Sequence, residues 1–137
     1  MPRLENKKED EKIVSELFED LETFGYLRWI KEDVYVLTDK FWGQIILQIP
    51  SYIKYVLQTG KKFKGDDELF IEFMTLAILA IISFERMKMN IPYEQATIFD
   101  EEYIKACTAL AVTIYKYNKD MAVRILNIVK SILLGFM

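Results

Sequence analysis

Apolar residues recur at three- and four-residue steps from Ile13 to Phe24, which is the spacing of one face of an amphipathic helix. Gly25 follows directly, and glycine readily adopts the left-handed conformation that ends many helices. The pattern predicts a helix over 13–24. The charged arm over 1–12 is either a frayed tail or the solvated start of this helix.

Two short β-branched and aromatic runs, 26–30 and 34–37, flank three polar residues and predict a small β-hairpin. Thr38 then stands where a helix N-cap is expected. Pro50 lacks an N–H group, so it must kink or split the helix that follows, and the second piece should end near Gly60.

The longest predicted helix runs from 66 to about 90, with Asp66 or Asp67 as its N-cap and Pro92 beyond its end. Its segment 73–84 shows no polar face, yet it is shorter than the roughly 20 apolar residues of a membrane span. We therefore expect a buried central helix.

Asp100 is expected to cap the next helix, which has a single apolar face. The residues expected on that face are Tyr103, Cys107, Leu110, Ile114 and Tyr117. The last helix, over 120–136, has only a thin polar stripe and therefore an excess of apolar surface. This surface either closes the monomer core or forms a seam between copies. The candidate interface residues are Ile125, Ile128, Val129, Ile132, Leu133 and Phe136.

The predicted fold class is mainly α, a compact bundle of five or six helices with one short N-terminal β-hairpin. A length of 137 residues favours one domain, here over 13–137. Within it, 13–60 should form the helix, the hairpin and the kinked helix, and 66–137 the apolar helical core.

The composition excludes several common catalytic and metal-binding sites, because the chain has no histidine and one cysteine. Disulfide frameworks, zinc fingers and histidine-based catalytic triads are thereby excluded. The 18 basic and 21 acidic residues give a net charge of −3, which argues against binding nucleic acid through phosphates. The start of the chain has no secretory pattern, so we expect a cytoplasmic protein. Abundant isoleucine, lysine and glutamate are compatible with a thermophilic source.

The segment 15–38, a helix followed by a β-turn-β unit and Thr38, resembles the recognition helix and wing of a winged-helix DNA-binding domain. In that family two further helices precede this unit, so the three-helix core here would either be completed by later helices or be absent. The resemblance implies wing contacts by Arg28 and Lys31. It also implies groove-facing residues on the helix, which are Glu16, Glu19, Asp20, Glu22 and Thr23. Carboxylates at these positions would repel phosphates.

Lysines in the loop over 60–65 form a second candidate for nucleic-acid contact, with Phe63 available to stack on a base. The residues are Lys61, Lys62 and Lys64. A solvated turn explains the same residues more simply, because glycines bracket the loop.

Carboxylates are the remaining candidate for metal chemistry, because Asp and Glu can hold Mg²⁺ without histidine. Glu16, Glu19 and Asp20 share one helix face, as do Glu68 and Glu72, and helical nucleotide pyrophosphohydrolases place paired acids in this way. Cys107 has no histidine to activate it and is expected in the core.

The sequence thus favours a non-enzymatic interaction or assembly module, without a cofactor, that self-associates through its C-terminal helices. Its expected partner is a second copy or another protein. A winged-helix-like transcription regulator is the first alternative, and a carboxylate, magnesium-dependent helical hydrolase is the second.

Overall fold

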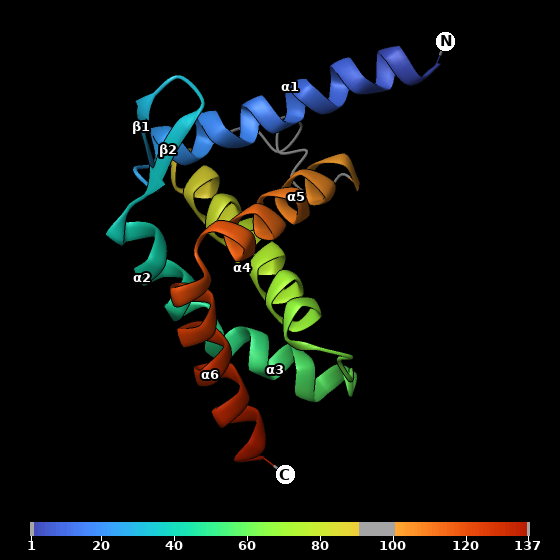
Figure 1. Ribbon diagram of the computed structural model, residues 1–137, viewed down its shortest axis with the longest axis vertical. Helices are drawn as coiled ribbons and strands as arrows, with labels where there is room; N and C mark the ends of the chain where they lie inside the picture. Colours follow the sequence, from blue (N-terminus) through green and yellow to red (C-terminus); the bar gives the residue numbers. More distant parts are fainter. Residues whose placement is uncertain (1, 91–100, 137) are drawn as a thin grey trace.

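The computed structural model describes residues 2–90 and 101–136, with side chains described for 11–90 and 101–136. These ranges hold six helices and one two-stranded antiparallel sheet, which confirms the predicted mainly α class with an N-terminal hairpin (Figure 1). The elements are α1 Pro2–Thr23, β1 Leu27–Lys31, β2 Val34–Leu37, α2 Asp39–Leu47, α3 Ile49–Thr59, α4 Asp66–Lys88, α5 Glu101–Tyr117 and α6 Lys119–Leu134.

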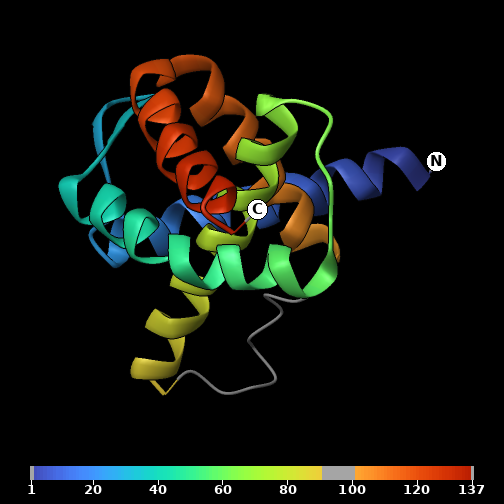
Figure 2. The same ribbon diagram turned by 90° about the horizontal axis from the view of Figure 1, so that it is seen from below.

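Helix α1 includes the charged arm, which is therefore the start of the helix and not a separate tail. Its first turns project beyond the other elements in both views (Figures 1 and 2). Gly25 ends this part of the chain with a φ of 85°, and its N–H donates to the Glu22 carbonyl at 3.0 Å. The predicted left-handed cap is confirmed.

The hairpin pairs Leu27 with Leu37 and Trp29 with Tyr35. Thr38 joins it to α2, because its hydroxyl donates to the Gly25 carbonyl at 2.7 Å and accepts from the Phe41 N–H at 3.4 Å. The predicted N-cap is confirmed by this second bond.

Pro50 separates α2 from α3, as predicted, with the break at Gln48 and the proline in the first turn of α3. Helix α3 then ends at Thr59 and is capped by Gly60, whose φ of 64° is left-handed.

The predicted N-cap of α4 is wrong, because Gly65 occupies that position and Asp66 already begins the helix. Asp66 and Asp67 lie in the first turn instead, where the helix dipole favours negative charge. The helix ends at Lys88. The expected Asp100 cap and Pro92 lie outside the described residues.

Helix α4 is the centre of the bundle, because α2, α3, α5 and α6 all pack against it. Helix α1 instead packs mainly on α5 and on the hairpin strand β1. Tyr117 was expected on the buried face of α5 and is exposed, because it is the last residue of that helix. None of the helices in the described ranges combines the length and the apolar run needed to cross a bilayer.

Candidate functional site

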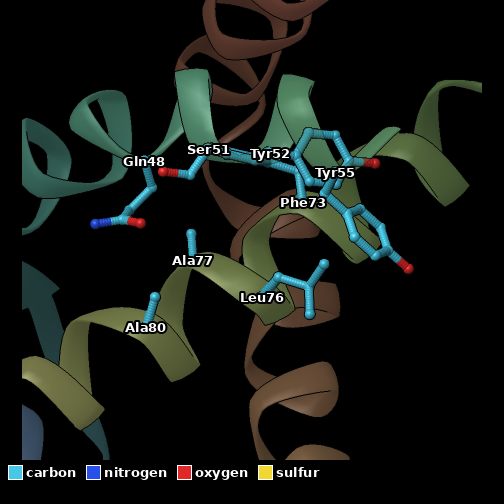
Figure 3. A pocket seen from close by; sticks show the side chains of 8 residues that line it. All are labelled: Gln48, Ser51, Tyr52, Tyr55, Phe73, Leu76, Ala77 and Ala80. Atoms are coloured by element: carbon cyan, nitrogen blue, oxygen red, sulfur yellow. The ribbon is translucent and has the colours of Figure 1, made fainter. Parts of the chain in front are cut away.

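An open, largely apolar groove runs along one side of α4, between α3 and α5. It comprises two adjoining cavities of about 210 Å³ and about 450 Å³, which share Tyr55 and Leu76. The smaller cavity is lined by Gln48, Ser51, Tyr52, Tyr55, Phe73, Leu76, Ala77 and Ala80 (Figure 3). The larger is lined by Tyr55, Glu68, Ile71, Glu72, Thr75, Leu76, Ile104 and Thr108. We call the two together the α4 groove.

The floor of the α4 groove is a row of α4 side chains four residues apart, namely Glu68, Glu72, Leu76 and Ala80. Leu76 and Ala80 are exposed, as is Phe84 at the next position of the row. The expectation that 73–84 would be buried all round is therefore wrong on this side. Helices α3 and α5 flank the row and leave it uncovered.

Glu72, an acidic residue of the groove floor, is bound by side chains from α3 and from the loop that follows α3. The Tyr52 ring packs edge-on against Phe73 at 5.1 Å, and its hydroxyl donates to Glu72 at 3.3 Å. Burial raises the pKa of Tyr52 well above its ordinary value, so this hydroxyl remains a donor. Lys61 forms an ion pair with the other oxygen of Glu72. Figure 3 shows Gln48 and Ser51 at the opposite end of the smaller cavity from Tyr55 and Leu76.

Two of the six candidate interface residues on α6 face inward. Ile125 and Val129 are buried together with Ala122 and Leu126, on the face that packs against α3, α4 and α5. Leu133 is partly buried against the same core. Ile125 and Val129 therefore cannot lie on an exposed surface, because the monomer core already covers them.

The other three, Ile128, Ile132 and Phe136, remain accessible, with exposed fractions of 40%, 36% and 64%. Together with Arg124 they lie at four-residue intervals, and we call these four residues the α6 row. Phe136 lies just past the end of α6, after its cap residue Gly135, whose backbone is still helical. Arg124 is exposed and has no ion-pair partner among the described side chains. Val123, also exposed, lies on another side of the helix, because successive residues are about 100° apart.

Asp20, which the winged-helix resemblance would place toward DNA, points into the fold instead. The Asp20 carboxylate accepts from Arg86 Nε at 3.1 Å and from the Tyr103 hydroxyl at 3.1 Å. These bonds link α1 to α4 and α5. Of the remaining implied residues, Glu16 is half-buried, whereas the others are exposed; the latter are Glu19, Glu22 and Thr23.

A second polar contact was missed by sequence reasoning. The buried Tyr26 hydroxyl donates to Glu85 at 2.6 Å, and Lys40 and Lys88 lie 3.9 and 3.8 Å from the Glu85 carboxylate. Burial, and next the hydrogen bond to Glu85, raise the pKa of Tyr26 above its ordinary value. The one sequence signal for this contact was an acidic residue, Glu85, directly after the apolar run 73–84.

The basic candidate residues do not form one cluster. Arg28 and Lys31 are exposed on β1. In the loop before α4, all three lysines are exposed, but Lys61 is also paired with Glu72. The loop therefore offers less free positive charge than its sequence indicates.

The candidate metal ligands Glu68 and Glu72 are engaged within the chain, since Glu68 accepts from the Lys64 N–H at 3.1 Å. In the part of the chain that the structure describes, no group of three or more acidic, cysteine or histidine side chains could hold a metal ion. Cys107 is fully buried, as predicted, and burial raises the pKa of its thiol to about 12.

Comparison of the chain with protein-family models, with curated proteins and with solved structures found no significant match.

Proposed function

We propose that the protein is a non-enzymatic assembly module that self-associates through the exposed part of α6. The observation that carries this proposal is the α6 row, where Ile128 and Ile132 on α6 and Phe136 just past its end are large apolar side chains that stay accessible to solvent. Covering them in a contact between copies would remove apolar surface from water, which is the main favourable term in most protein association.

The contacts of the polar residues support a non-enzymatic role. Asp20, Glu72 and Glu85 each bind side chains from other elements of the same chain, so these carboxylates stabilise the fold. Cys107 is a buried thiol whose raised pKa disfavours the reactive thiolate.

Size-exclusion chromatography with light scattering tests the proposal. We expect the wild-type chain, of 16.2 kDa, to give at least twice that mass at high micromolar concentration. Ile132→Asp should give the monomer mass, because it places a charge within the contact. Val123→Asp is the matched control, since it introduces the same charge on another exposed side of α6 and should leave the mass unchanged. A wild-type chain that stays monomeric would refute the proposal.

A further inference from the structure

The α6 row and the floor of the α4 groove have matching lengths. The α6 row runs from Arg124 to Phe136 and the groove floor from Glu68 to Ala80. Each spans three intervals of four residues, which is about 18 Å for the groove floor at the rise of an α-helix. The last interval of the α6 row passes the end of α6 at Leu134. Both are accessible rows of the i, i+4 type, the type that interdigitates in the commonest class of helix packing.

The two ends of the rows are complementary in charge and in size when the rows run in the same direction. Glu68, at the start of the groove floor, is exposed, and its described contact is with the Lys64 backbone. Arg124, at the start of the α6 row, is exposed and lacks a described ion-pair partner. At the far end, the small side chain of Ala80 would meet the large ring of Phe136.

Helix α6 cannot fill the groove of its own chain. It packs on the other side of α4, where Lys130 forms an ion pair with Asp66 at 2.9 Å. Asp66 precedes Glu68 by two residues and so lies about 200° from it around the helix. An α6 row in the α4 groove must therefore come from a second molecule.

We propose that the α4 groove receives the α6 row of a second copy, with the partner's Arg124 beside Glu68 and the partner's Phe136 over Ala80. This inference rests on the proposed self-association and specifies its geometry. The contact joins two different surfaces of the chain, so it is heterologous and repeats into a ring or a filament. A symmetric contact between two α6 rows would instead stop at a dimer.

Mixing two complementary variants tests this geometry. Ala80→Trp fills the groove and leaves α6 intact, whereas Ile132→Asp damages the α6 row and leaves the groove intact. We expect each variant alone to be monomeric in light scattering, with at least a tenfold loss of self-affinity. Their mixture should form a heterodimer of twice the 16.2 kDa chain mass, because one intact groove meets one intact α6 row.

Two results would overturn the inference while leaving self-association standing. One is an Ala80→Trp variant that assembles like the wild type, and the other is a mixture that stays monomeric although both variants are folded by circular dichroism. A monomeric wild-type chain would instead remove the proposed function itself, and the inference with it.

Charge reversal provides a second test that does not depend on filling the groove. Glu68→Arg and Arg124→Glu should each weaken self-association about twofold to fivefold, as expected for an exposed ion pair. The double variant should recover the wild-type affinity. If the double variant is weaker than either single variant, the proposed pairing of these two residues is wrong.

Discussion

At the scale of single residues, Tyr26 and Tyr103 each place a buried hydroxyl group against a carboxylate from a distant element. Tyr26 donates to Glu85, and Tyr103 donates to Asp20. Burial is the main cause that raises the pKa of each phenol, and the neighbouring carboxylate adds to it. Both groups therefore keep their protons in the folded protein at a pH where exposed tyrosines ionise.

The raised tyrosine pKa values predict a loss of stability in alkali. The contribution of these groups is fully present below about pH 10, the unfolded pKa, and is lost as the pH rises toward the folded values. We expect the free energy of unfolding in urea to fall above that pH, and to fall less steeply in Tyr103→Phe than in the wild type. Tyr117→Phe, at an exposed site, should keep the wild-type slope. Identical slopes in all three proteins would contradict the prediction.

At the scale of elements, local signals explain where the helices and the hairpin begin and end. Gly25, Pro50 and the N-cap bond from Phe41 to Thr38 each involve backbone groups within a few residues, so these effects could be predicted from sequence. At α4, by contrast, the N-cap is Gly65 and not Asp66 or Asp67 as predicted. Several neighbouring residues could fill this role, and small differences in backbone geometry decide between them.

Two glycines should respond in opposite directions to the same substitution. Gly25→Ala is expected to lower the free energy of unfolding by about 1 kcal/mol, because the left-handed φ of 85° is unfavourable for alanine. Gly43→Ala should raise it by roughly 0.5–1 kcal/mol, because Gly43 lies within α2 and an added methyl group meets no atom within 4 Å. Urea unfolding measures both, and shifts of the same sign would show that backbone conformation does not govern these sites.

At the scale of the whole molecule, Asp20 connects the N-terminal helix to the central bundle. It binds Arg86 of α4 and Tyr103 of α5, residues 66 and 83 positions away in the sequence. Few other polar contacts in the described ranges bridge such long separations. We therefore expect this carboxylate to contribute to holding α1 on the bundle.

Removing this charge should destabilise the fold. Asp20→Asn is expected to lower the free energy of unfolding by roughly 1–3 kcal/mol, because it weakens hydrogen bonds that involve charged, partly buried groups. Glu19→Gln is the matched control, since the neighbouring side chain is exposed. Chemical denaturation of both variants checks the prediction, and equal stability of the two would indicate that the contact adds nothing.

The exposed surfaces of α4 and α6 could be predicted from the sequence much less well than the helices and strands, because exposure depends on tertiary packing. The apolar excess of 120–136 was visible in the sequence, but Ile125 and Ile128 looked equivalent there. In the structure Ile125 is buried and Ile128 is exposed, because α3, α4 and α5 cover only one side of α6. The α4 groove was not foreseen, since an all-apolar segment gives no indication of which side its neighbours leave open.

The sequence by itself determined the helical class, the hairpin, the break at Pro50 and the burial of Cys107. These features follow from backbone preferences and hydrophobic spacing within a few turns of chain. Only the tertiary structure decided which apolar rows on α4 and α6 stay accessible and which acids are held by distant partners. Solvent access at a position depends on elements far away in sequence, and their packing directions are not encoded in the local pattern.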